Sequence, residues 1–404
     1  MKLKVHTLNL ILILSAIFIM VFFHHWIIDL KYQFPLEIII VFPLILYNYK
    51  FILHNNKEGL NPIIFTSFFL LMLLNIISAF NGDNMLVFGD LSANLAVSIT
   101  YLLMFLYFLF GTVLFQKIEL ETIRKFIFFI LLIVFFVVLF EYLWIEVKFG
   151  LINFYNVVLE IDYIESIKYR SIGPFKNPNN LAVFTSFLLA FLMGRKSIAY
   201  NFLIFGLAGF IIARSGSRTG LILISFLLIY EVVVKGKSFG KKIYKFVLIV
   251  IGIFCLFTFT KIGETPLINR VTNSGLSSGL EARSNIYWDN AFKLISESPV
   301  LGVGLIQNEN ATTDNFFLSV LKTNGLLGLI LFLIPIFILM RLFIKQIKRG
   351  NSAPFLFMMV FLLGSITGDF FYSRPFYPFF FTMAGFYYYG VMINKDNFRL
   401  AHTS

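Results

Sequence analysis

Apolar segments separated by short polar ones recur along almost the whole chain. Each apolar segment is about 18–25 residues long, which is enough for a helix to cross roughly 30 Å of hydrocarbon. We therefore predict an all-α polytopic membrane protein with about twelve transmembrane helices. The predicted helices are residues 8–28, 36–53, 62–80, 93–115, 124–147, 179–194, 198–213, 217–234, 243–260, 316–340, 354–368 and 375–394.

The composition supports a membrane protein and excludes a soluble globular one. Of the 404 residues, 59% are hydrophobic, 53 are Phe and only 13% are charged. The first apolar segment lacks a small-residue cleavage site, so we expect it to be a retained helix. No soluble domain is evident, and residues 1–404 are predicted to form a single membrane domain. The only cysteine, Cys255, excludes a disulfide within the chain.

The net charge of +12 is explained by membrane topology rather than by nucleic acid. An even number of helices places both termini on one side, and the short loops of that side carry most of the Lys and Arg residues. Most of the acidic residues lie on the opposite side. We therefore predict cytoplasmic termini in the cytoplasmic (inner) membrane, and no nucleic-acid partner. Two long loops, at 148–178 and 261–313, are then on the outer face.

The first outer loop ends in the polar tract RSIGPFKNPNN. Its two prolines stiffen the backbone, and Asn179 or Asn180 is expected to cap the helix that follows. A capped helix start presents free amide groups and a positive dipole end. This suggests the edge of a binding site for an anionic, lipid-linked substrate, although a loop with a capped re-entry into the membrane is an alternative. The candidate binding residues are Arg170, Lys176, Asn177 and Asn179.

A second basic tract, RSGSRTG, brackets a short turn with Arg214 and Arg218. Ser217 is expected to cap the next helix, so Arg218 should lie in its first turn. A cation there opposes the helix dipole and is unfavourable unless an anion sits nearby. Arginine presents a planar set of donors that suits phosphate oxygens. The alternative is that these arginines are anchors that reach the membrane surface, or partners of the acidic residues on the outer side.

The second outer loop is predicted to contain an amphipathic helix on the outer surface. From 281 to 295 apolar residues recur at helical spacing, and Pro299, Gly302 and Gly304 should end the segment in a tight turn. This segment carries Arg283. Farther along, Asp314 and Lys322 are eight residues apart, which places them on one helix face. A buried structural pair between them is the alternative to a role in the site.

The order of these tracts resembles the O-antigen polymerase and ligase superfamily, over roughly residues 90–395. The tracts are RSIGPFKNPN at 170–179, SRTG at 217–220, Arg283, Trp288, Pro299, Gly302 and Gly304, and Asp314-Asn315 with Gly325. The resemblance implies a GT-C-like fold with undecaprenyl-pyrophosphate-linked glycans as donors at the outer face. It also implies that Arg218 and Arg283 hold the donor pyrophosphate. Ligases of the family have His directly before the Asn of the last tract. This chain has Asp314 there, which favours the polymerase branch.

The expected reaction joins a sugar hydroxyl to the anomeric carbon of a second lipid-linked glycan, with inversion. Arginines can stabilise the departing pyrophosphate without a metal, and no outer DxD-like or His-rich tract indicates a metal or a cofactor. A carboxylate can accept the acceptor proton. The catalytic candidates are Arg218, Arg283 and Asp314. The binding candidates are Arg170, Lys176, Asn177, Asn179, Arg214, Asn315 and Lys322.

The predicted function is polymerisation of lipid-linked repeat units of an O-antigen, capsule or exopolysaccharide. Its expected partners are undecaprenyl-pyrophosphate-linked glycans and the lipid bilayer, and a protein that regulates chain length is left open. Another transferase of the superfamily, such as an O-antigen ligase, is the first alternative. A lipid-linked oligosaccharide flippase is the second. The clustering of polar tracts on one face favours an enzyme over a flippase, which needs a cavity open alternately to both sides.

Overall fold

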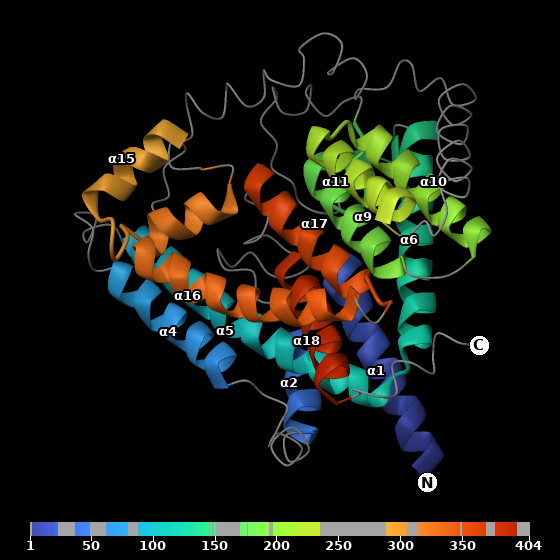
Figure 1. Cartoon of the computed structure of the whole chain (residues 1–404), viewed down its shortest axis with the longest axis horizontal. Coiled ribbons are helices and arrows are strands. Elements are labelled where there is room, and N and C mark those ends of the chain that lie inside the picture. The colour runs from blue at the N-terminus through green and yellow to red at the C-terminus, as the bar shows by residue number, and fades with distance from the viewer. Residues whose placement is uncertain are drawn as a thin grey trace. The chain divides into compact units, whose positions relative to one another are not determined.

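The computed structural model describes a set of separate ranges of the chain. These are residues 2–22, 37–48, 62–79, 88–144, 146–147, 149–150, 170–175, 177–193, 197–234, 288–304, 313, 315–347, 350–368 and 376–393. Within them every regular element is a helix (Figure 1). The all-α prediction is therefore confirmed for the described part of the chain.

The helices follow the apolar segments of the sequence. They are α1 (Lys2–Phe22), α2 (Ile38–Tyr47), α4 (Pro62–Ala79), α5 (Phe88–Lys117), α6 (Leu120–Leu143), α9 (Pro178–Leu192), α10 (Ile198–Ser215), α11 (Arg218–Ile229) with a π-helical turn η2 (Tyr230–Val234), α15 (Asp289–Glu297), α16 (Phe316–Ile347), α17 (Ala353–Thr367) and α18 (Phe376–Ile393). Every predicted span contains a helix except 243–260, which lies outside the described residues. Among the described helices, three are long and apolar enough to cross a membrane, namely α5 over Val97–Leu114, α6 and α16, and shorter apolar helices accompany them. The protein is a multi-pass membrane protein.

The second predicted span is shorter than expected within the described residues. It was predicted at 36–53, whereas α2 has ten residues. Asn48 leaves the helical conformation, and its side-chain amide donates to the carbonyl oxygen of Leu44 at 2.7 Å. This side-chain bond closes the last turn of α2, a local signal that apolar length alone does not reveal.

The chain divides into two compact units. Unit 1 comprises residues 1–120, 280–358 and 365–404, and unit 2 comprises residues 121–279 and 359–364, the latter from the middle of α17. Because compact units of this kind also occur inside one membrane domain, the single domain over residues 1–404 stays a prediction.

The centre of unit 1 is the pair formed by α5 and α18. Every side chain that the structure describes on α18 is buried, so this helix is surrounded by protein. A Cβ atom on Gly111 would lie 1.9 Å from the carbonyl oxygen of Thr382, and one on Gly385 would lie 2.0 Å from that of Phe108. Each helix thus uses a glycine to let the backbone of the other approach, as is common between membrane helices. Beside this pair, α4 packs on α5 and on α16 (Figure 1).

The helix α16 is broken at Gly325, which has φ 64° and ψ −170°. The break is bridged by the tight turn after α15. Val303 and Gly304 donate their amides to the carbonyl oxygens freed on one side of the break, and the amides freed on the other side donate to Pro299 and Val300. The four bonds are Val303 N to Lys322 O at 3.0 Å, Gly304 N to Thr323 O at 3.0 Å, Leu326 N to Pro299 O at 2.9 Å and Leu327 N to Val300 O at 3.2 Å. The backbone groups at the break are therefore satisfied inside the protein, as a membrane interior requires.

A buried polar network holds the helices around this break together. Tyr101 of α5 donates its hydroxyl to Asn324 at 3.0 Å, and Asn324 donates to Asn75 of α4 at 3.0 Å. Asn75 in turn donates to Ser98 at 2.8 Å, and the hydroxyl of Ser78 donates to the carbonyl oxygen of Leu301. The network links α4, α5, the first half of α16 and the tight turn.

We expect Gly325→Ala to destabilise the protein strongly. A left-handed conformation costs a residue with a side chain about 1–3 kcal/mol, and here a Cβ would also lie 2.2 Å from the carbonyl oxygen of Val300. Thermal unfolding of the purified protein in detergent measures the effect. Gly206→Ala is the matched control, because a Cβ there meets nothing within 4 Å and alanine favours a helix. Equal unfolding temperatures for Gly325→Ala and the wild type would contradict the broken helix.

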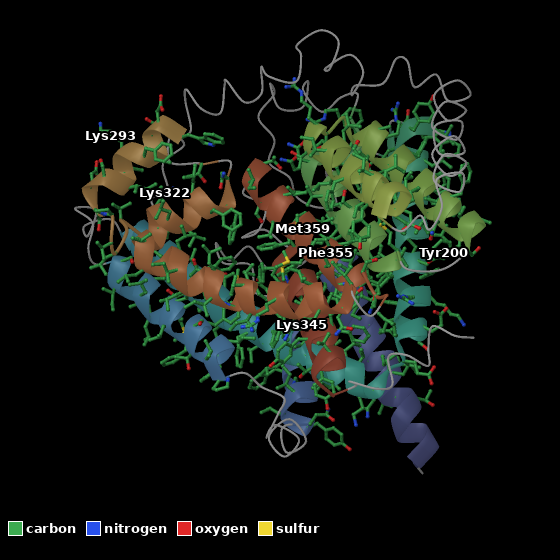
Figure 2. All side chains as sticks on the ribbon, viewed as in Figure 1. Tyr200, Lys293, Lys322, Lys345, Phe355 and Met359 are labelled. Atoms are coloured by element: carbon green, nitrogen blue, oxygen red, sulfur yellow. The ribbon has the colours of Figure 1, made fainter. Side chains whose placement is uncertain are left out.

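The predicted amphipathic segment at 281–295 corresponds in part to α15. Residues 281–287 lie outside the described part. In α15, Ala291 is buried, Leu294 and Ile295 are half-buried, and Lys293 is exposed (Figure 2). These apolar residues thus lie on a more buried side of α15 than Lys293 does, while the amphipathic helix on the outer membrane surface stays a prediction.

Unit 2 is built around α9. All its side chains from Leu181 to Leu192 are buried, and it packs against both α10 and α11. A Cβ on Gly220 would lie 2.5 Å from that of Ala182, so α9 and α11 touch close to their first turns. The rings of Phe135 on α6 and Phe210 on α10 lie 5.2 Å apart. These helices form the group labelled α6, α9, α10 and α11 in Figure 1.

Candidate functional site

One end of unit 2 gathers most of the candidate binding residues. Because α9 and α11 touch near their first turns, both helices begin at this end, and α10 ends there. The backbone amide of Ser171 donates to the carbonyl oxygen of Arg214 at 2.9 Å, so the loop before α9 is tied to the last turn of α10. We call this region the arginine end, defined by Glu141, Tyr142, residues 170–179 and residues 214–220.

Arg170 joins three elements at the arginine end. Its side chain is largely buried, with 9% exposed. Its Nε donates to the carbonyl oxygen of Ser215 at 2.7 Å, and its Nη2 donates to Oδ1 of Asn179 at 3.0 Å. The guanidinium therefore ties the loop to the end of α10 and to the first turn of α9. These contacts give Arg170 a role in organising the site, beside the substrate contact predicted from the sequence.

The turn that follows Arg170 is held by a carboxylate from α6. Oε2 of Glu141 accepts the amide of Ile172 at 3.0 Å, and Oε1 accepts that of Gly173 at 2.9 Å. Phe175 closes the turn by donating its amide to the carbonyl oxygen of Ile172 at 3.1 Å. Gly173 has φ 59°, and a Cβ there would lie 2.9 Å from Cδ1 of Leu181. Both the conformation and the close contact favour glycine.

The cap of α9 is Asn177, and the prediction of Asn179 or Asn180 was wrong. Oδ1 of Asn177 accepts the amide of Asn179 at 2.8 Å, while the backbone of Asn177 is extended. The physical reason is Pro178, which has no amide hydrogen and a fixed φ, and is therefore favoured at the first helical position. Asn179 lies one residue inside the helix, where its side chain is used by Arg170 instead.

The turn between α10 and α11 agrees with the sequence prediction. Gly216 ends α10 in the left-handed conformation with φ 62°, and Ser217 caps α11 by accepting the amide of Gly220 at 3.2 Å. Arg218 is the first residue of α11 and is half-buried. A cation and a positive helix end are therefore placed together, which favours an anion beside them.

Arg214 faces the same end of unit 2 from the last turn of α10. Its guanidinium carbon lies 4.1 Å from the centre of the Tyr142 ring, in a cation–π contact. Its Nε atom is buried and has no hydrogen-bond partner among the residues that the structure describes. The Tyr142 ring packs against the face of the Arg214 guanidinium. The N–H donors at the edge of the guanidinium are therefore suited to an anion.

The remaining described candidates, Asn315 and Lys322, lie in unit 1. Asn315 caps α16, because its Oδ1 accepts the amide of Leu318 at 3.1 Å, and its Nδ2 donates to the carbonyl oxygen of Ile366 at 3.1 Å. Lys322 lies in the first half of α16, before the break, and only 2% of it is exposed (Figure 2). Both residues thus stand close to the broken segment of α16.

Three candidates lie outside the described residues, namely Lys176, Arg283 and Asp314. Their roles, and the pairing of Asp314 with Lys322, stay predictions. Within the described ranges no three His, Cys, Asp or Glu side chains come together as a possible metal site. The absence of a metal likewise stays a prediction.

Sequence reasoning missed Glu141 and Tyr142. Both lie at the end of a long apolar segment, so their place on α6 was predicted but their contacts were not. A signal was present, because an acidic residue inside an apolar membrane segment is costly and is usually retained for a contact or a function. The partner of such an acid, here a loop 31 residues farther along the chain, cannot be found from local pattern.

Part of the chain matches a known protein family. Residues 203–333 match the Wzy_C family model, described as O-Antigen ligase. These residues are similar to the Wzy_C domain of Wzy-type polymerases and ligases. The resemblance seen in the sequence is therefore confirmed. Members of this family are enzymes that transfer lipid-linked glycans in the membrane. Comparison with curated proteins found no match to the chain.

The Wzy_C match divides the candidate residues into two groups. It covers Arg214, Arg218, Arg283, Asp314, Asn315 and Lys322. It begins after the RSIGPFKNPNN tract, which is bound to the end of α10, and after Glu141, which is bound to that tract. The Wzy_C segment is therefore completed at the arginine end by residues that precede it in the chain.

Proposed function

We propose that this Wzy_C protein polymerises undecaprenyl-pyrophosphate-linked oligosaccharide repeat units. It transfers the growing glycan from its lipid carrier to a new lipid-linked unit at the outer face of the cytoplasmic membrane. The termini are cytoplasmic, and the loops 148–178 and 261–313 face outward. The observation that carries the proposal is the arginine end, where Arg218 begins a helix and Arg214 stands over an aromatic ring.

The arginine end suits the pyrophosphate of a lipid-linked donor. Arg218 and the positive end of the α11 dipole present positive charge to one place, and Arg214 adds a second guanidinium from the last turn of α10. Arg283, which lies outside the described residues, is a further arginine proposed to grip the pyrophosphate. Preorganised cations of this kind stabilise a leaving group more in the transition state than in the ground state.

The proposed step is a single displacement at the anomeric carbon. The hydroxyl oxygen of the acceptor sugar forms a bond to the anomeric carbon of the donor glycan, and the bond from that carbon to the pyrophosphate oxygen breaks. The acceptor proton passes to the carboxylate of Asp314, and undecaprenyl pyrophosphate leaves with the bonding electrons. Attack from the opposite face inverts the anomeric centre. The arginines take the place of a metal ion.

The choice of polymerase over ligase is supported by one position. Family ligases carry His directly before the Asn of the last tract, whereas Asp314 precedes Asn315 here. A ligase or another transferase of the family is the second candidate, because both branches use the same activated donor. A flippase is a weaker candidate, because the three arginines Arg170, Arg214 and Arg218 gather at one end of unit 2.

Deletion of the gene tests this function through the length of the cell's glycans. We expect single repeat units to reach the surface, because export and final attachment continue without polymerisation. Gel electrophoresis of the surface polysaccharide measures chain length, and the wild-type gene on a plasmid should restore long chains. Long chains that remain on the lipid carrier would instead indicate a ligase. Loss of all exported glycan would indicate a flippase.

A further inference from the structure

We propose that Glu141 is a positioning residue for the arginine end, acting through the turn at 172–173 and through Arg170. This inference rests on the proposed function, since it assigns the residue that holds the proposed pyrophosphate site in shape. Glu141 lies in the last turn of α6, ahead of the Wzy_C segment, and only 4% of it is exposed.

Glu141 fills a small anion-binding concavity made by the chain itself. The amides of Ile172 and Gly173 point to the same carboxylate, one to each oxygen. Successive amides that converge in this way, beside a residue with positive φ, form a nest that binds anions. Because the carboxylate of Glu141 occupies the nest, an incoming phosphate cannot use these two amides. A phosphate at this end of unit 2 is directed to the arginines instead.

The turn held by Glu141 determines where Arg170 lies. Arg170 is two residues before Ile172, and the amide between them, that of Ser171, is bonded to the carbonyl oxygen of Arg214. The guanidinium of Arg170 then reaches Ser215 and Asn179. Ser215 is the last residue of α10 and directly follows Arg214. A shift of the loop would therefore move the segment between Arg214 and Arg218, two arginines proposed to bind the pyrophosphate.

The neighbouring residue on α6 supports Arg214 directly. Tyr142 follows Glu141 in the chain, and its ring lies under the guanidinium of Arg214. The last turn of α6 thus holds the loop with one side chain and the arginine with the next. Loss of the Glu141 bonds should disturb the arginine geometry even when the helices stay folded.

The experiment measures binding of undecaprenyl pyrophosphate to the purified full-length protein in nanodiscs. Glu141→Gln keeps the shape of the side chain but turns one acceptor oxygen into a donor, which faces a backbone amide. We expect the Kd for undecaprenyl pyrophosphate to rise by roughly 10-fold or more, with a thermal unfolding temperature close to that of the wild type. Glu141→Asp keeps the carboxylate on a shorter side chain, and its Kd should lie between those of the wild type and Glu141→Gln. Glu146→Gln removes an exposed acid from the same region and should bind as the wild type does.

A double-variant cycle separates positioning from a purely structural role. Arg170→Lys keeps the charge but cannot reach both Ser215 and Asn179, and we expect it to weaken binding similarly. If Glu141 acts through Arg170, the double variant with Glu141→Gln and Arg170→Lys should have a Kd no higher than that of the single variant that binds more weakly. Additive losses, or unchanged binding by folded Glu141→Gln, would overturn the proposal. If Glu141→Gln does not fold, the same cycle with Glu141→Asp gives the decision.

Failure of the positioning proposal can be told apart from failure of the proposed function. Arg218→Ala is measured in the same assay. If it abolishes binding while the Glu141 variants bind normally, the pyrophosphate site stands and only the role of Glu141 is wrong. If Arg218→Ala binds undecaprenyl pyrophosphate as the wild type does, the pyrophosphate site itself is wrong, and the positioning role that rests on it is wrong as well.

Discussion

Arg218→Lys is expected to slow glycan transfer almost as much as Arg218→Ala, by about 10²–10³. Arg218 is the first residue of α11, directly after the Ser217 cap, where a cation is unfavourable unless an anion is bound. Lysine keeps the charge but offers a point donor in place of a planar fork, so it cannot hold two phosphate oxygens at once. The rate is measured as the growth of glycan chains on lipid-linked repeat units in liposomes that contain the purified protein.

Arg341→Ala is the matched control, because Arg341 is an exposed arginine on α16. The Arg341→Ala protein should therefore polymerise the glycan at the normal rate. Arg283→Ala should show a loss similar to that of Arg218→Ala if both arginines grip the pyrophosphate. Unfolding temperatures near that of the wild type are required for each variant. Near-normal chain lengths in well-folded Arg218→Ala and Arg283→Ala proteins would refute the arginine clamp.

Asp314→Asn is expected to lower the rate of transfer by about 10²–10⁴. The amide keeps the size of the side chain and one acceptor oxygen, but it cannot take up the proton of the acceptor hydroxyl. The same liposome assay measures the rate, and binding of undecaprenyl pyrophosphate should be unchanged because the proposed base acts on the acceptor hydroxyl and not on the pyrophosphate. A loss of rate without a loss of donor binding is the signature of a base.

The alternative for Asp314 is a structural pair with Lys322. Lys322 is almost wholly buried, and a buried cation that loses a partner is strongly destabilising. A structural pair predicts poor expression of Asp314→Asn, and partial rescue when Lys322 is also replaced by a neutral residue such as Met. Normal chain lengths in a well-expressed Asp314→Asn protein would move the base elsewhere and leave the arginine clamp standing.

The features predicted well from the sequence are those that depend on near neighbours in the chain. Apolar length predicted the helices, and the tract RSGSRTG predicted the Ser217 cap and the place of Arg218, because a cap acts over three residues. The cap of α9 was also a local matter, and Pro178 was the signal that should have selected Asn177. Local hydrogen bonding and side-chain type are sufficient for decisions of this kind.

The sequence by itself therefore determined an apolar, all-helical protein and the polar tracts that give it its chemistry. Tertiary structure alone decided which of those tracts meet. The bonds from Glu141 to the 172–173 turn and from Arg170 to Ser215 join residues that are 31 and 45 positions apart at the nearest. The break at Gly325 likewise depends on the turn near Gly302, whose backbone satisfies the amides and carbonyls that α16 gives up. Such contacts are set by the packing of helices distant in the chain, because a buried polar group takes whichever partner the fold brings within reach.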